Sequence, residues 1–310
     1  MLSAKEKQKL LVWTGAGLLL QMLAAVPNLY CQEATSLQIP AAELVRQTIE
    51  HELQAAKNAS HRHLFRSRKQ LPRGSQTRLY VETDDSMAGM TIAINDQPIS
   101  PQQQKSEEDH LYWLAGNPEQ LRKKRAREQE DEERTLRILR AMPAAFRYEY
   151  AGIENAGPGL GRAGNALQRL KFSPNPSYSP PTRVEQVLEG IQGYLLVDAA
   201  ARRLALIDGT LFRDVTFGWG IIGHLDKGGR FRVQQADVGD DSWQITSMSL
   251  KITGKILLFK GISIISEESF SDFQPVAANL SFAKAVELLK AEQAKLVRSA
   301  NSDDDGKAER

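Results

Sequence analysis

The chain has 310 residues, of which 41% are hydrophobic and 25% are charged. This is the usual composition of a globular protein, so a wholly disordered chain and a multispanning membrane protein are excluded. Lys and Arg number 40 against 38 Asp and Glu, and this balance gives no charge excess that would indicate nucleic acid as a partner.

The amino terminus has the order of an export signal. Three lysines within the first nine residues precede an apolar stretch from Leu10 to Val26, and a polar sequence begins near Gln32. We therefore predict that residues 1–31 are a signal peptide and that the protein is exported to the periplasm. An amino-terminal membrane anchor facing the periplasm is the alternative, because a run of roughly 17 apolar residues is at the lower limit for spanning a bilayer.

Cysteine usage limits the chemistry of the exported chain. Cys31 is the only cysteine, and it lies at the end of the predicted signal. A disulfide scaffold, thiol chemistry and a cysteine zinc site are therefore excluded for the mature protein. The fold must be held together by burial of apolar side chains.

The first half of the chain is predicted to form a helix, three strands and two further helices. Val45, Ile49 and Leu53 recur at helical spacing. Apolar residues that alternate with polar or small ones, separated by turn residues, then predict antiparallel strands. Two helices are predicted to begin at Ser100 and Asn117, each of which is followed by Pro. The helices are expected at 40–57, 101–115 and 118–142, and the strands at 64–69, 77–82 and 90–94.

The middle of the last of these helices, residues 122–133, is almost purely charged. Such a pattern is typical of an exposed helix that is held by its apolar end, here Leu136, Leu139 and Met142. A helix that binds a partner is the alternative interpretation.

The second half of the chain is predicted to be strand-rich. About seven antiparallel strands are expected between residues 190 and 275, with Asp226–Gly229 as a strong hairpin turn and Gly254 as another. A glycine-rich loop, a proline-rich connection, a closing helix and a polar disordered tail complete the chain. These are expected at 151–164, 172–181, 281–298 and 299–310.

No motif for catalysis, metal binding or cofactor binding is convincing. Residues 159–164 match G-x-G-x-x-G, but no parallel βαβ pattern surrounds them. His61 and His63 would share a strand face without a third ligand. No G-x-S-x-G or H-E-x-x-H occurs. We predict a protein that is not an enzyme and has no catalytic residue, metal or cofactor, although an enzyme built from scattered residues stays open.

Basic residues gather early in the chain, and they predict an exposed strand face or, alternatively, contact with an anionic membrane surface. This basic patch comprises Arg62, Arg66, Arg68, Lys69, Arg73 and Arg78.

Large apolar residues alternate with small ones later in the chain. Phe217, Trp219 and Ile221 share one face of a strand, and Gly218 and Gly220 lie between them. Glycine in a strand permits bending or close approach. The segment is therefore a curved core strand or a strand bent around a hydrophobic cavity, and Phe217, Trp219 and Ile221 are the candidate ligand-binding residues.

The order of these parts, together with the segments 92–98, 193–198 and 203–208, resembles the LolA-like periplasmic proteins, which include lipoprotein carriers, RseB-type sensors and mycobacterial lipid-binding lipoproteins. The resemblance covers residues 40 to 275, and the hairpins from Phe217 onward also resemble exported proteins of acidobacterial type. It implies an α+β fold in which a strongly curved antiparallel sheet forms an open half-barrel, with a helical lid and flanking terminal helices. We expect a single domain at 32–280 with the lid inserted at 100–142.

The resemblance implies a non-enzymatic protein of the cell envelope that binds an apolar ligand, a lipid or a lipoprotein acyl chain, in a cavity of the curved sheet. The alternative is an envelope sensor or scaffold that acts through protein contacts of the charged helix 118–142. Neither hypothesis involves nucleic acid.

Overall fold

The structure is a computed structural model that describes residues 39–58, 61–217, 223–256 and 260–308. The predicted signal peptide at 1–31 lies outside these residues. The chain divides into two units, Met1–Ile39 and Pro40–Arg310. All described residues except Ile39 belong to the second unit, which contains every helix and strand named below.

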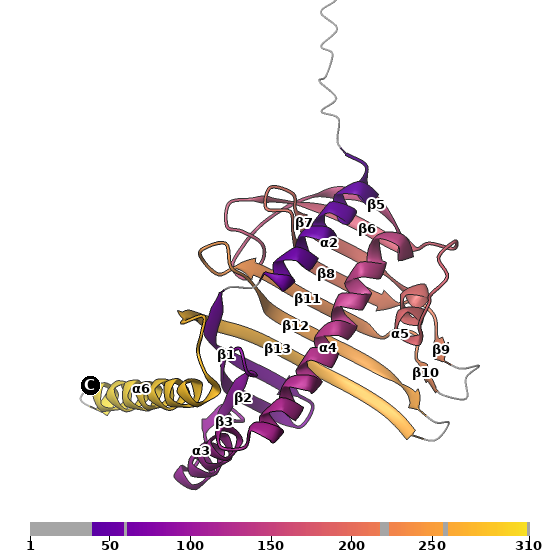
Figure 1. Cartoon of the computed structure of the whole chain (residues 1–310). Helices are drawn as coiled ribbons and strands as arrows, with labels where there is room; N and C mark the ends of the chain where they lie inside the picture. Colours follow the sequence, from indigo (N-terminus) through magenta and orange to yellow (C-terminus); the bar gives the residue numbers. More distant parts are fainter. Residues whose placement is uncertain (1–38, 59–60, 218–222, 257–259, 309–310) are drawn as a thin grey trace, which may run out of the picture. The chain divides into compact units, whose positions relative to one another are not determined.

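The strands of the described residues form one 13-stranded sheet, in which every pairing is antiparallel (Figure 1). The strand order is β4-β3-β2-β1-β13-β12-β11-β8-β7-β6-β5, with β10 paired to β12 and β9 paired to β10. The strands are β1 (Arg62–Leu71), β2 (Gly74–Val81), β3 (Ala88–Ile94), β4 (Gln97–Pro98), β5 (Phe146–Asn155), β6 (Ala166–Pro174), β7 (Ile191–Asp198), β8 (Arg203–Leu211), β9 (Val215–Phe217), β10 (Gly223–Leu225), β11 (Arg230–Asp237), β12 (Trp243–Ile256) and β13 (Lys260–Val276).

The helices pack against this sheet in two groups. Helices α2 and α4 contact β5, whereas α3 and α6 contact β3. The bounds are α2 (Ala41–Lys57), α3 (Pro101–Ala115), α4 (Pro118–Ala145), α5 (Arg183–Gln186), the 3-10 helix η1 (Val187–Gly190) and α6 (Phe282–Ala308). None of the helices in the described part of the chain combines the length and apolarity needed to cross a bilayer.

The apolar core has three parts. The main core lies between α2, the carboxyl end of α4 and strands β5 to β8, and it buries Leu44, Val45 and Ile49 of α2. A second core joins α3 and α6 to β1, β2 and β3, and a small third core includes Leu206 and Trp243. Helices α2, α3, α4 and α6 each bury an apolar face, formed by residues three or four apart, against the sheet. Removal of these apolar side chains from water is the expected source of the fold's stability.

The fold class is confirmed as α+β with a large antiparallel sheet. The predicted strong curvature is wrong: the sheet is open, ends at β4 and β5, and is not strongly curled. The expected curvature follows from the resemblance and from the glycine-containing strand at 217–222, of which residues 218–222 lie outside the described residues. The expectation of one domain at 32–280 stays a prediction.

Strand β5 is absent from the predicted elements. Residues 151–155 are expected in a loop, but they complete β5, which pairs with β6 from Phe146↔Pro174 to Asn155↔Ala166. A sequence signal for β5 exists, because Phe146, Tyr148 and Tyr150 alternate with charged residues immediately after α4. Helix α4 also continues past its predicted end at Met142, because Pro143 lies in its last turn.

Gly254 is not a turn residue, contrary to the prediction. It lies inside β12 opposite Leu225 of β10, where a Cβ atom would come within 2.2 Å of the His224 carbonyl oxygen. The glycine is needed for this close approach of two strands. The next strand, β13, runs unbroken from Lys260 to Val276.

The closing helix α6 extends to Ala308, so residues 299–308 of the expected disordered tail continue it. Extension of an existing helix costs little per residue compared with its nucleation. Ser100, which is expected to begin a helix, does so with a capping box: its hydroxyl accepts from the Gln103 amide, and the Gln103 side chain accepts from the Ser100 amide at 2.9 Å.

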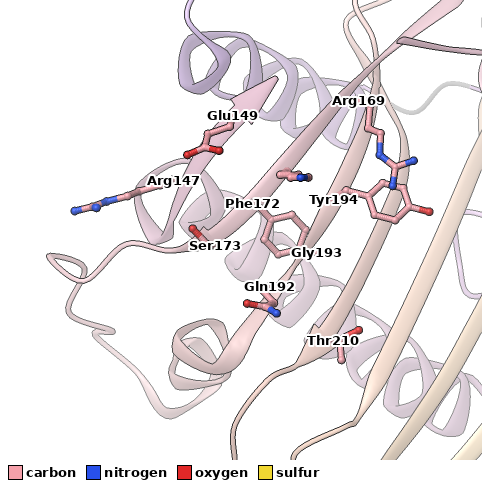
Figure 2. Close-up of a pocket in the computed structure, with 10 residues that line it drawn as sticks. Arg147, Glu149, Arg169, Phe172, Ser173, Gln192, Gly193, Tyr194 and Thr210 are labelled. Carbon is pink, nitrogen blue, oxygen red and sulfur yellow. The ribbon is translucent and has the colours of Figure 1, made fainter. Parts of the chain in front are cut away.

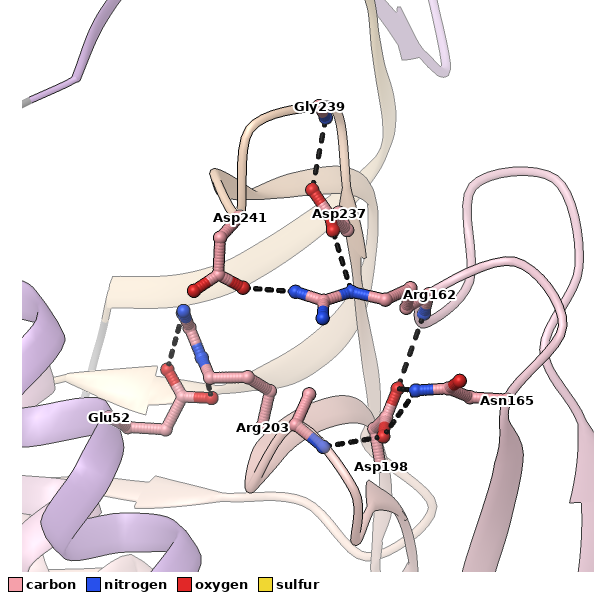
Figure 3. Close-up of polar contacts among 9 residues, drawn as sticks. Glu52, Arg162, Asn165, Asp198, Arg203, Asp237, Gly239 and Asp241 are labelled. Atoms are coloured by element: carbon pink, nitrogen blue, oxygen red, sulfur yellow. Dashed lines mark hydrogen bonds and ion pairs between the residues drawn. The ribbon is translucent and has the colours of Figure 1, made fainter.

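A buried ion pair ties α2 to the sheet (Figure 3). The Arg203 guanidinium donates two hydrogen bonds of 3.0 Å to the Glu52 carboxylate, which also accepts from the Leu204 amide at 2.7 Å. Both side chains are nearly buried. Three donors on one carboxylate offset the desolvation of the pair, and loss of one partner leaves a buried charge unpaired.

We therefore expect Glu52→Ala to lower the free energy of unfolding by about 3–5 kcal/mol. The control is Glu43→Ala, which removes an exposed partner of Arg46 on the same helix and should leave the urea midpoint nearly unchanged. Equal midpoints for the two variants in urea denaturation followed by circular dichroism would show that the Glu52 pair does not stabilise the fold.

Candidate ligand-binding site

Helix α4 is fixed at both of its ends. At the carboxyl end Ala141, Met142 and Ala145 are buried in the main core, and the Tyr148 hydroxyl donates to the Met142 carbonyl at 2.8 Å. Burial raises the pKa of Tyr148 above its ordinary value, so the hydroxyl stays protonated and remains a donor. This end of the helix is therefore anchored to β5.

The amino-terminal third of α4 is fixed to the loop between β2 and β3. The Ser86 hydroxyl donates to the Glu128 carboxylate at 2.7 Å, and the Lys124 ammonium donates to the Met87 carbonyl at 2.6 Å. Strands β3 and β5 lie near opposite ends of the sheet. A helix that contacts both must pass over the strands between them, and Figure 1 shows α4 crossing the sheet in this way.

Between its two anchors the helix touches little. All seven residues from Gln129 to Thr135 are exposed. Seven residues make about two helical turns, so every side of this segment, including the side toward the sheet, is accessible to solvent. We call residues 129–135 the bridging segment.

An apolar strip continues the main core on the same face of the sheet. Phe231 packs against the main core and is opposite Leu250; Val233 is opposite Met248, and Ile252 is opposite Ile264. Directly opposite residues in paired strands share one face. None of these side chains is fully buried, and Ile264 is 45% exposed. The apolar strip comprises Phe231, Val233, Met248, Leu250, Ile252 and Ile264.

The strip ends in polar side chains toward β1. Glu268 follows Ile264 on the same face of β13 and accepts a hydrogen bond of 2.5 Å from Ser67. Lys69 lies 3.2 Å from the same carboxylate. The arrangement is a partly exposed apolar surface with a polar margin, beneath a helix that is anchored at its two ends.

Of the predicted ligand-binding residues, the structure describes Phe217. It ends β9, is half-buried, and packs against the main core, as does Leu225 on the neighbouring β10. Trp219 and Ile221 lie outside the described residues. Phe217 thus adjoins the same core that the apolar strip continues, and its role in binding a ligand stays a prediction.

A polar groove lies on the opposite face of the sheet (Figure 2). Its volume is about 450 Å³, and Arg147, Lys171 and Tyr194 line it while their neighbours Tyr148, Leu170 and Leu195 point into the main core. The Arg169 guanidinium lies 3.9 Å from the centre of the Tyr194 ring and pairs with Glu154. Its charged lining does not suit an apolar ligand.

The predicted basic patch on β1 and β2 is largely paired with acids. Arg62 pairs with Asp84 at 3.2 Å, Arg66 with Asp272 at 3.2 Å, Arg68 with Asp96 at 2.7 Å and Lys69 with Glu268 at 3.2 Å. Hydrogen bonding from Arg68 lowers the pKa of Asp96. These pairs remove most of the charge that would attract an anionic membrane to this patch.

His61, just before β1, and His63 within it have different surroundings. His61 is exposed, whereas His63 is buried and lies 3.4 Å from both Ser242 and Gln244 and 3.5 Å from Glu82. In the part of the chain that the structure describes, no group of three or more His, Cys, Asp or Glu residues could hold a metal ion.

The glycine-rich segment 159–164 has a structural role. Asp198, fully buried at the end of β7, accepts from the Asn165 side chain at 2.9 and 3.0 Å and from the Ala201 amide at 2.9 Å (Figure 3). Arg162 pairs with Asp237 at 2.7 Å and also with Asp241. The segment thereby closes the third core. No sequence pattern indicates the contacts of Asn165 and Arg162 with these acids, because the partners are 33 to 79 residues apart.

No family model and no curated protein matches the sequence. Among solved structures the chain is similar to a domain from Vibrio parahaemolyticus that is provisionally described as an outer membrane lipoprotein-sorting protein domain. The identity is 12%, the TM-score is 0.28, and the match covers 79% of this chain and 99% of that domain. At this TM-score no residue role and no ligand of that domain is carried over to this chain.

The two-ended anchoring of α4 can be tested at Glu128. Glu128→Ala removes the acceptor for Ser86 and the partner of Lys124, so we expect amide hydrogen exchange in residues 118–130 to rise by a factor of about 5–10, equivalent to about 1–1.4 kcal/mol of lost local stability. Glu132→Ala, one turn further along α4, is the control. The anchor is refuted if exchange rises equally in both variants.

Proposed function

We propose that this chain is a non-enzymatic cell-envelope protein that binds an apolar ligand, a lipid or a lipoprotein acyl chain, on the apolar strip beneath α4. The observation that carries the proposal is the combination of a partly exposed apolar strip with a bridging segment exposed on all sides. An exposed apolar surface rimmed by polar side chains is typical of an interaction site.

The residues of the strip favour an acyl chain over a polar ligand. Phe231, Leu250 and Ile264 offer only apolar contact, so binding would be driven by removal of apolar surface from water. Each buried methylene group contributes about 0.8 kcal/mol. Affinity should therefore rise by about fourfold for each methylene group until the strip is filled.

Two features of the sequence support the cellular setting. Residues 1–31 have the order of an export signal, and the layout of residues 40–275 resembles the LolA-like periplasmic proteins. An exported protein with an accessible apolar strip is suited to shield an acyl chain from water in the envelope.

Neighbouring isoleucines of β13 provide a matched test. Ile264 lies on the apolar strip and is 45% exposed, whereas Ile265 lies on the opposite face and is 41% exposed. Ile264→Asp places a carboxylate against the bound chain and should weaken binding of a fluorescent fatty acid by at least about tenfold. Ile265→Asp should leave binding nearly unchanged.

Measurement of these affinities by fluorescence titration decides the site. Equal affinities for the two variants at unchanged urea midpoints would rule out the apolar strip as the binding surface. Native mass spectrometry of protein purified without detergent from its host, followed by organic extraction, then identifies the ligand class, since an acyl species bound at near one-to-one is expected.

The charged bridging segment favours a second candidate function. Because Gln129–Thr135 is exposed on every side, it is also available to a protein partner, as an envelope sensor or scaffold requires. In that case protein purified from its host carries no lipid, and crosslinks from the bridging segment to a partner weaken with added salt.

A further inference from the structure

Unpaired positive charge gathers near the start of α4. Five of the six residues from Arg122 to Arg127 are basic, and all five except Lys124 are exposed. Lys123 pairs with Glu119 and Lys124 with Glu128, but no ion pair to Arg122, Arg125 or Arg127 is formed among the described residues. This differs from β1, where most of the cations have carboxylate partners.

An exposed tryptophan lies on the preceding helix. Trp113 is 50% exposed in the last turn of α3, and the His110 ring stacks on it at 5.9 Å between centres. Its neighbours Leu111 and Leu114 are buried in the second core. The helix is therefore held firmly while the indole faces solvent, although tryptophan is a residue that usually gains from leaving water.

The tryptophan and the arginines belong to one corner of the fold. Only Gly116 and Asn117 separate α3 from α4, and the Asn117 side chain donates to the Trp113 carbonyl at 2.5 Å. Leu114 before the junction and Leu121 after it pack in the same core. Trp113 and Arg122 are thus each within about one and a half turns of the junction. We call Trp113, Arg122, Arg125 and Arg127 the α3–α4 corner.

We propose that the α3–α4 corner is a docking surface for an anionic lipid bilayer. The arginines would face lipid phosphates, to which guanidinium groups bind strongly, and Trp113 would enter the headgroup region, where tryptophan is enriched. A cluster of basic residues beside an interfacial aromatic is the pattern expected of a peripheral membrane contact. This surface is separate from the apolar strip and does not depend on the function proposed for it.

Charge segregation along α4 also gives the contact an orientation. Four consecutive acids, Glu130–Glu133, follow the basic run, and Arg134 pairs with two of them. An anionic surface attracts residues 122–127 and repels residues 130–133, so the basic end of the helix would approach the membrane and the bridging segment would stay away from it.

Sedimentation with lipid vesicles tests the proposal. The protein is purified as it accumulates in its host, with its amino terminus read by mass spectrometry, so that any contribution of residues 1–31 is common to all variants. Vesicles of phosphatidylcholine alone are compared with vesicles containing roughly one third phosphatidylglycerol. We expect binding to the anionic vesicles only, and weaker binding as salt is added.

Matched charge reversals locate the surface. Each cation near a membrane contributes about a fivefold factor in affinity, so Arg122→Glu with Arg125→Glu should lower vesicle affinity by at least about 25-fold. Trp113→Ser should lower it by about fivefold. Arg147→Glu with Lys171→Glu makes the same charge change in the polar groove of the opposite face and should change affinity by less than about twofold.

The proposal is overturned if the wild-type protein fails to bind anionic vesicles at low salt, or if the two double variants lose affinity equally. Every substituted residue has an exposed side chain, so the urea midpoints should be unchanged, which is checked by circular dichroism. Binding of the fluorescent fatty acid should be retained by the Arg122 and Arg125 variant, so failure of this proposal is distinguishable from failure of the apolar strip.

Discussion

The fold depends on the position of β13, which pairs with β1 on one side and with β12 on the other. This 17-residue strand joins strands from the beginning of the chain to the meander of the second half. Without it β1 to β4 would form a separate small sheet. Long-range pairing of this kind is entropically costly, and it is stabilised here by the length of the two ladders and by burial of the second core against α6.

The candidate ligand-binding site follows from this continuity. Because one sheet extends from β4 to β5, a single helix can be anchored at Met87 near one end and at Tyr148 near the other. The strands between the anchors include β11, β12 and β13, and these three carry the apolar strip. The same interaction that unites the sheet therefore also creates an apolar surface with no helix packed on it.

Local elements could be predicted from the sequence, and their assembly could not. The helical spacing of Val45 and Ile49 and the capping box at Ser100 predict α2 and α3 almost to the residue. Strand β5 is harder to predict although Phe146 and Tyr148 alternate with charges, because it directly follows a charged helix and the glycine-rich sequence from Ala151 indicates a loop. Gly254 was misassigned because only the neighbouring β10 explains it.

The candidate site was predicted only in outline. A helix covering an apolar sheet was expected, and Phe217 does adjoin the main core, but the apolar strip on β11 to β13 was not singled out. Its residues look like ordinary core positions in the sequence. What distinguishes them is that α4 leaves them uncovered, and the pairing of Glu128 with Ser86, 42 residues away, is what holds the helix in this place.

The composition of α4 explains why it does not close onto the strip. From Arg122 to Thr135 the only apolar residue is Ala126, so this stretch has nothing to bury. The helix is instead supported by its two anchors and by local ion pairs such as Arg134 with Glu130. A helix that packed on the sheet would need an apolar underside. The apolar strip is therefore left partly exposed, and this exposure is the feature on which the proposed binding of an apolar ligand rests.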